Sequence, residues 1–273
     1  MTESGFPINV NVPAPSRRYD AWLGGKDNFA ADRASAAAIG NAFPPITLAV
    51  AENRRCLLRV VRHLADECGI RQFLDVGSGV PRRRNVHDVA QEVALDSRVV
   101  YVDNDPMVAV HARALFVGTR EGAVAFHLGD LREPKQILTA DLVRDTLDFT
   151  RPIGVLLFAV LHFLPDTAEA QTAVDQLVDA LPRGSYLAIS HATFDPIPDD
   201  MRTKLTAFTK ADSTDGPFRP RSRDEIAAFL HGLDLVDPGI VSTVHWHPDL
   251  EPPADPGVTE AEAISYVAVA VKP

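Results

Sequence analysis

The chain has 273 residues, of which 46% are hydrophobic and 23% are charged. That length and composition allow one large domain with a buried core and argue against disorder as the main state. With 27 basic and 37 acidic side chains the net charge is −10, which argues against a general nucleic-acid binder. Cys56 and Cys68 are the two cysteines, so a disulfide scaffold is excluded and a reducing compartment is expected.

The N-terminus has neither the basic nor the apolar region of a signal peptide. No apolar run reaches the roughly 20 residues that cross a bilayer, and the longest candidate, 153–164, fits a buried strand better. We therefore expect a cytoplasmic protein without membrane contact.

The N-terminal part of the chain predicts an arm followed by two helices. The first residues, to about Pro15, contain three prolines and little periodicity, as a loose arm would. Asp27 is expected to cap a helix over 28–39, with Gly40 as its end. A second helix is predicted over 47–67, where apolar residues recur on one face.

From residue 73 onward the pattern changes to alternating strands and helices. Asn85 and Asp105 are expected to cap two of the helices, and a third is predicted over 166–181. The expected strands are short apolar runs at 73–76, 99–102, 124–128, 154–158 and 186–189. Repeated strand–helix units indicate a parallel, doubly wound sheet of the α/β class.

The C-terminal part of the chain departs from this alternation. Residues 196–220 form a partly helical insertion, and Ser222 begins a capping box for a helix that ends near Leu230. The last two strands, near 240–246 and 264–271, have no predicted helix between them and should pair antiparallel at the sheet edge. This layout is that of a Rossmann-like class I methyltransferase sheet with an N-terminal helical cap. We predict one domain over 1–273, with an arm and lid or cap in 1–47 and the core in 48–273.

The strongest local motif, Asp75-Val76-Gly77-Ser78-Gly79, lies where the first strand passes into a turn. Its glycines allow a ligand to approach the backbone closely. A nicotinamide enzyme would place a third glycine at the helix start, but residues 80–84 intervene here. Asp75 also favours a cationic ligand, such as a sulfonium amino acid, over a diphosphate. The alternative is a tight turn that binds nothing.

Two further carboxylates follow at the ends of the next strands. Asp103 could accept both hydroxyl hydrogens of a ribose, and Asp130, in Gly129-Asp130-Leu131, could accept from the exocyclic amine of adenine. Asp130 could instead serve only as a turn or cap residue. Three acidic strand ends in successive units together describe a pocket for adenine, ribose and a cationic amino-acid tail.

These motifs lie within longer matching strings at 18–29, 73–81, 85–91, 100–106, 160–163 and 184–187. On them the chain resembles the actinobacterial S-adenosylmethionine-dependent methyltransferase family formerly catalogued as a domain of unknown function. The resemblance covers most of the chain and implies a Rossmann-like fold and S-adenosylmethionine as cofactor. It departs at Arg82, where Thr usually follows the proline. We assign cofactor binding to Asp75, Gly77, Ser78, Gly79, Asp103, Asn104, Asp130, Leu131, Tyr19, Gly24, Gly25 and Asn28.

The N-terminal string has two physical interpretations. Gly24 and Gly25 break any helix between Tyr19 and Asp27, and a flexible polar hairpin there could close over a ligand. The alternative is a cap helix packed for stability, with Trp22 and Phe29 in the core.

Catalytic roles are assigned to His162 and Tyr19. His162 follows the fourth strand and could be a general base, or could bind a backbone group or position the cofactor. His191 is a weaker candidate. His245 and His247 would share one strand face, but a surface position is favoured over a metal pair. Arg82-Arg83-Arg84 could attract an anionic acceptor, but a solvated loop is favoured. No metal is expected.

The sequence therefore predicts direct methyl transfer from S-adenosylmethionine to an unidentified small-molecule acceptor. The alternative is a non-catalytic, regulatory S-adenosylmethionine-binding protein. A nicotinamide-dependent oxidoreductase fits less well, because the third glycine is missing.

Overall fold

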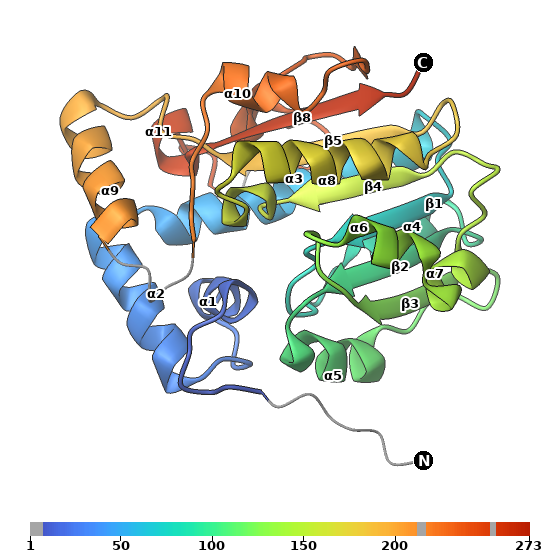
Figure 1. The fold of residues 1–273 in the computed structure, drawn as a ribbon, viewed down its shortest axis with the longest axis horizontal. Helices are drawn as coiled ribbons and strands as arrows, with labels where there is room; N and C mark the ends of the chain where they lie inside the picture. The colour runs from blue at the N-terminus through green and yellow to red at the C-terminus, as the bar shows by residue number, and fades with distance from the viewer. Residues whose placement is uncertain (1–7, 212–216, 252–254) are drawn as a thin grey trace.

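A computed structural model describes residues 8–211, 217–251 and 255–273. Its centre is a mixed sheet in the order β3-β2-β1-β4-β5-β8-β6, with β7 also paired to β8 (Figure 1). Strands β1 to β5 are parallel, and β8 runs antiparallel to its neighbours. The strands are β1 Gln72–Val76, β2 Arg98–Asp103, β3 Ala123–Leu128, β4 Gly154–Phe158, β5 Tyr186–Ala192, β6 Asp234–Leu235, β7 Val241–Ser242 and β8 Ser265–Val271.

Helices cover both faces of this sheet. Because side chains alternate along a strand, Leu74 and Val76 of β1 pack on one face and Phe73 on the other. The first face is covered by α6, α7, α8 and α10, and the second by α3 and α4 (Figure 1). The helices are α1 Pro15–Trp22, α2 Ala30–Ala42, α3 Ile46–Asp66, α4 Val86–Val93, α5 Pro106–Leu115, α6 Pro134–Thr139, α7 Asp141–Thr146, α8 Thr167–Asp179, α9 Asp199–Ala211, α10 Arg223–Ala228 and α11 Glu260–Ala263, with 3₁₀ turns η1 Leu161–Phe163 and η2 Thr243–His245.

The predicted α/β class, the parallel order and the main helix caps are confirmed. The Asp105 carboxylate accepts from Met107 N at 2.9 Å, with Pro106 as the first helical residue of α5. The Asn85 N–H donates to Asp88 at 2.7 Å at the start of α4. Helix α3 begins at Ile46, close to the predicted 47–67. Residues close to each element specify these elements, which is why they can be predicted from the sequence.

The predicted helix over 28–39 is wrong at both ends. Helix α2 begins at Ala30, where the Asp32 carboxylate accepts the N–H of Phe29 at 2.8 Å, so Asp27 is not the cap. The helix also continues through Gly40 to Ala42. It ends before Pro44 and Pro45, which cannot supply helical N–H donors.

The C-terminal strands are shorter and less regular than predicted. The pairing of β7 with β8 is antiparallel as expected, but β7 has two residues and passes directly into η2. The short helix α11 also lies between the two strands, contrary to the prediction. His245 is in η2 rather than in a strand, and its Nε2 lies 2.9 Å from Glu260. Of the insertion at 196–220, α9 is helical as expected, and residues 212–216 lie outside the described part of the chain.

Helix α1 was expected only under the alternative of a cap helix, and α6 and α7 were not predicted. Helix α1 ends at Trp22, just before the glycines expected to break it, and Trp22 Nε1 donates to Ala36 O of α2 at 3.0 Å. It lies beside the carboxyl ends of the parallel strands (Figure 1). Of the predicted arm, residues 1–7 are outside the described ranges.

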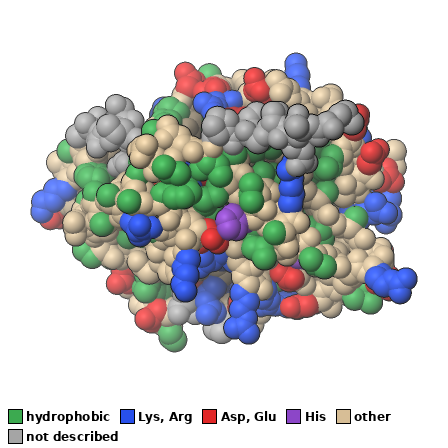
Figure 2. All heavy atoms as spheres, turned by 90° about the horizontal axis from the view of Figure 1, so that it is seen from below, with side chains coloured by type: hydrophobic (Ala, Val, Ile, Leu, Met, Phe, Trp, Pro, Cys, Tyr) green, Lys and Arg blue, Asp and Glu red, His purple; other side chains and the backbone are tan. Residues whose placement is uncertain are grey.

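The face seen from below in Figure 2 carries a band of hydrophobic side chains with Lys and Arg side chains beneath it. Within the described ranges no single helix is long and apolar enough to cross a membrane. Only α2 and α3 taken together, with a bend of 103° between them, reach that length and composition.

Candidate active site

A cavity of about 280 Å³ opens at the carboxyl ends of β1, β2 and β3. This is the edge at which open α/β sheets bind ligands. Eight of the residues assigned to cofactor binding lie together around it, namely Asp75, Gly77, Ser78, Gly79, Asp103, Asn104, Asp130 and Leu131. Tyr19 of α1 lines it as well.

The turn after β1 gives the cavity its floor. The N–H groups of Gly77 and Ser78 donate to Val102 O of β2, at 2.8 and 3.1 Å. Gly77 has φ of +81°, and a Cβ there would lie 2.6 Å from Cγ2 of Val160. The sequence therefore requires glycine at this point, because a side chain would strain the backbone and displace Val160.

Two polar atoms in the cavity have no hydrogen-bond partner among the described residues, Oδ2 of Asp75 and Oγ of Ser78. Asp75 is 2% exposed, and burial raises its pKa to about 7 against the attraction of Arg54. Buried polar atoms are normally hydrogen-bonded, so two unpartnered atoms at the wall of one cavity are available to a ligand there. Asp75 therefore fits a cationic group, as the sequence predicts.

Asp103 is held in place by the backbone around it. Its Oδ2 accepts from Gly79 N at 2.8 Å and its Oδ1 from Asp105 N at 3.0 Å. Burial raises its pKa to about 6 despite these two bonds. Each carboxylate oxygen still has a free lone pair, so Asp103 can accept from ribose hydroxyls.

Asp130 is oriented by Arg132 and by Asn104, whose Nδ2 donates to it at 3.0 Å. Although partial burial opposes it, hydrogen bonding from Arg132 and Asn104 lowers the pKa of Asp130 to about 2. It is a permanently ionised acceptor at the cavity rim. That suits the amino group of an adenine, and it is also compatible with the turn role.

Gly24, Gly25 and Asn28 do not line the cavity as the structure describes it. They enclose the buried carboxylate of Asp20, which accepts from Asp27 N at 2.9 Å and from Asn28 Nδ2 at 2.8 Å. A Cβ at Gly25 would overlap that carboxylate, and Gly24 has φ of +71°. Their assignment to cofactor binding stays a prediction. The contacts that they make hold the segment 20–28 around the Asp20 carboxylate.

Arg82 completes this cluster. Its Nη1 donates to Asp20 at 2.7 Å and its Nη2 to Leu23 O at 2.7 Å, so it joins the end of α1 to the loop after β1. The departure of the sequence at Arg82 therefore has a clear physical role. It is not a solvated loop residue, since it anchors the helix that covers the cavity.

A second cavity of about 170 Å³ adjoins the first. The two share Pro15, Tyr19, Asn53, Ala159 and Phe163. This shared wall is crossed by a chain of hydrogen bonds from β5 to α1.

In that chain, Ser190 Oγ donates to Asn53 Oδ1 at 2.5 Å, and Asn53 Nδ2 donates to the Tyr19 hydroxyl at 2.9 Å. The hydroxyl in turn donates to Val50 O at 2.9 Å. Ala159, at φ of +52°, donates to Ser190 Oγ. Burial raises the pKa of Tyr19 to about 12, so its hydroxyl stays protonated. These contacts favour a positioning role for Tyr19.

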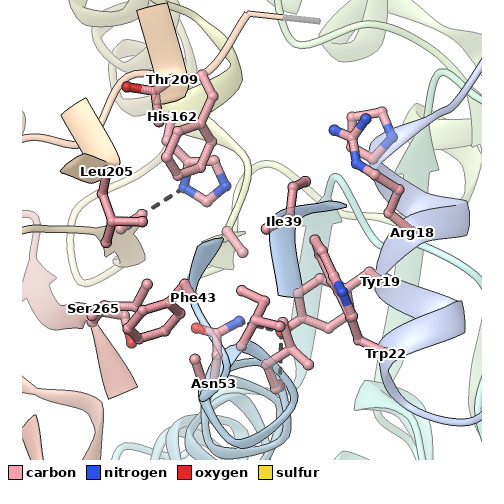
Figure 3. A pocket seen from close by; sticks show the side chains of 18 of the residues that line it. Arg18, Tyr19, Trp22, Ile39, Phe43, Asn53, His162, Leu205, Thr209 and Ser265 are labelled. Carbon is pink, nitrogen blue, oxygen red and sulfur yellow. Dashed lines mark hydrogen bonds between the residues drawn. The ribbon is translucent and has the colours of Figure 1, made fainter. Parts of the chain in front are cut away.

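His162 lines the second cavity and not the first (Figure 3). Burial, with the positive field of Arg221 and Arg18, lowers its pKa well below the usual value, so the ring is neutral. Its Nδ1 accepts from Ala192 N at 3.4 Å. His191 is committed elsewhere, since its Nε2 accepts from Arg221 at 2.9 Å and its Nδ1 donates to Ala192 O.

A family model described as S-adenosyl methyltransferase matches residues 1–273. The chain belongs to this S-adenosyl methyltransferase family. It is also similar to a DUF574 family protein from Streptomyces avermitilis MA-4680, at 40% identity over 98% of this chain and 100% of that one, with a TM-score of 0.91. A protein from Thermobifida fusca YX described as a candidate methyltransferase is 40% identical over 97% and 96%, with a TM-score of 0.86. No curated protein matches.

Both organisms are actinobacteria, so the family resemblance read from the motifs is confirmed. The cofactor of this S-adenosyl methyltransferase is S-adenosylmethionine, and the nicotinamide alternative is excluded. The residues fit this cofactor, because the unpartnered Oδ2 of Asp75 can accept a hydrogen bond from the ammonium group of its amino-acid tail. The described residues hold no group of three His, Cys, Asp or Glu that could bind a metal.

Sequence reasoning missed several residues that line the cofactor cavity, namely Pro13 before α1, Ser16 of α1, and Asn53 and Arg54 of α3. Of these residues, Asn53 could have been found from the sequence. Asn53 is a polar residue on the apolar face of α3, where a buried amide needs a specific partner.

Proposed function

We propose that the protein transfers the methyl group of S-adenosylmethionine to a small molecule held in the second cavity. Asp75 would bind the amino-acid tail, Asp103 the ribose hydroxyls, and Asp130 with Leu131 the adenine. One observation carries this proposal. A cavity lined by several carboxylates, with unpartnered atoms on Asp75 and Ser78, shares a wall with a cavity that has no carboxylate among its described lining residues.

The cofactor supplies a methyl group activated by its sulfonium charge. The protein aligns the acceptor with it, and alignment can contribute much of the rate without a chemical group taking part. Tyr19, Ala159 and Phe163 contact both cavities and would set that alignment. The hydrogen-bond chain through Asn53 and Ser190 fixes the positions of Tyr19 and Ala159.

Calorimetric titration with S-adenosylhomocysteine tests the cofactor assignment. Asp75→Ala should weaken binding at least tenfold, because the ammonium group of the ligand loses its counter-charge. Asp96→Ala is the matched control, since Asp96 is exposed in the turn before β2, at the other end of the strands. Equal affinity of both variants would contradict the assignment.

Product formation tests the acceptor. The protein is incubated with S-adenosylmethionine and with low-mass, protein or nucleic-acid fractions of a cell extract. We expect S-adenosylhomocysteine to form with the low-mass fraction. Turnover confined to a macromolecular fraction would contradict a small-molecule acceptor, and no turnover with any fraction would favour the non-catalytic alternative.

A further inference from the structure

The second cavity has the size of one ring. Its volume is about 170 Å³, and an apolar cavity of about 150 Å³ is known to hold benzene. Aromatic side chains surround it, namely Trp22, Phe43, Phe163, Phe194, Phe208 and Phe218. Such walls favour a flat ring, which can stack on some of them and meet the edges of others.

The charge around the cavity argues against an amine. Among the described residues that line it there is no Asp or Glu, and Arg18 carries the positive charge. His162 is neutral there, because its pKa is well below the usual value. An ammonium group would lose its water and gain no carboxylate, which is costly. The cofactor cavity, by contrast, does contain carboxylates.

His162 is one of the polar residues that line this largely apolar cavity. Because Nδ1 of His162 accepts the N–H of Ala192, the proton of the neutral ring is on Nε2. That nitrogen points away from Ala192 and toward the open part of the cavity (Figure 3). Nε2 can therefore donate a hydrogen bond, whereas the ring could accept a further proton only at Nδ1, which would break the bond from Ala192. It is a donor for an oxygen atom rather than a general base.

We propose that the acceptor is a neutral, single-ring aromatic molecule with two oxygen substituents. One oxygen is bound to Nε2 of His162, and the other, a hydroxyl at the shared wall, forms the bond to the methyl carbon while the carbon–sulfur bond breaks, S-adenosylhomocysteine leaves and the hydroxyl proton passes to water. The inference rests on the proposed function, since it places the methyl acceptor in the second cavity. His162 lies away from the cofactor cavity, whereas its neighbour Phe163 contacts both. His162 is therefore a positioning residue that orients the ring against the shared wall.

Tryptophan fluorescence reports binding at this place. The chain has two tryptophans; Trp22 lines the cavity, and Trp246 is fully buried among the residues packed between α3 and the sheet. The protein, saturated with S-adenosylhomocysteine, is titrated with p-cresol, toluene and benzylamine. We expect a saturable change with p-cresol, about five- to tenfold weaker binding of toluene, and at least about tenfold weaker binding of benzylamine. Trp22→Phe should remove the optical change.

The role of His162 is tested by His162→Phe. This variant should bind toluene as before and lose the preference for p-cresol, because only the hydrogen bond is removed. His111→Phe, at a half-buried position of α5 that lines neither cavity, is the control and should keep the preference. Leu205→Trp should block both ligands by filling the cavity.

The outcomes test three assignments separately, namely the proposed function, the acceptor class and the role of His162. A folded protein that binds no S-adenosylhomocysteine overturns the proposed function. A protein that binds S-adenosylhomocysteine but no ring compound, or binds benzylamine as tightly as p-cresol, overturns only the acceptor class. An unchanged preference in His162→Phe overturns the assignment of His162.

Discussion

The turn at 75–79 and the segment at 20–28 have a similar composition, with glycines next to carboxyl and other polar groups, but they use it differently. In the turn, Oδ2 of Asp75 and Oγ of Ser78 have no partner among the described residues. In the segment, the Asp20 carboxylate accepts from Asp27 N, Asn28 and Arg82. The unpartnered atoms of Asp75 and Ser78 are available to a ligand, whereas the hydrogen-bonded carboxylate of Asp20 holds the chain in place. A motif alone does not distinguish the two.

The largest expected effect is that of Gly77→Val. The added side chain meets Val160 and an unfavourable φ, so the turn must change shape, and binding of S-adenosylhomocysteine should fall at least about a hundredfold. Circular dichroism should show the helices retained. Gly184→Val is the matched control, because Gly184 has φ of +79° but lies at the other end of the sheet. Normal binding by Gly77→Val would show that this turn does not hold the cofactor.

The next effect is on stability rather than on binding. Asp20→Ala leaves Arg82 and the Asn28 amide without their acceptor, and should lower the free energy of unfolding by about 3 kcal/mol. Asp199→Ala, an exposed ion-pair partner of Arg202, should not change it measurably. Denaturant titration measures both. A stable Asp20→Ala protein that no longer binds cofactor would return this segment to the binding site.

The difference between the two regions also explains what the sequence could and could not predict. Strand ends and caps such as Asp103 and Asp105 depend on residues close by in the chain, so their pattern is visible. The partnership of Asp20 with Arg82 joins residues far apart, and no local signal reveals it. Helix α1 has an alanine, Ala14, at its N-cap and no side-chain cap, so Pro15 at its first position is the one local signal of its start. The two-residue strands β6 and β7 exist only because β8 offers them partners.

The third prediction concerns Asp103. Asp103→Ala should weaken cofactor binding by about 1–3 kcal/mol, since the ribose hydroxyls and Gly79 N lose a charged acceptor. Calorimetry on the folded variant measures this, with Asp96→Ala as the exposed control. Unchanged affinity would remove the ribose assignment while leaving that of Asp75 intact.

The smallest expected effect is a pH dependence of cofactor binding that comes from the unpartnered carboxyl group of Asp75. Burial raises the pKa of Asp75 to about 7, so in the free protein at pH 6 this group is mostly protonated. A cationic tail binds the ionised form, so binding must release a proton there. Affinity should therefore rise about five- to tenfold from pH 6 to pH 7.5.

The stability of the free protein should move in the opposite sense. Because the folded-state pKa of Asp75 lies above the usual value of 3.8, the folded protein holds this proton more tightly than the unfolded chain. The contribution of Asp75 is thus present at low pH and is lost as the pH rises through about 7. Calorimetry in two buffers of different ionisation enthalpy measures the released proton, and Asp75→Asn should abolish both the release and the stability slope. If the release persists in Asp75→Asn, a different group carries it, with Asp103 the next candidate, because its pKa of about 6 titrates in the same range.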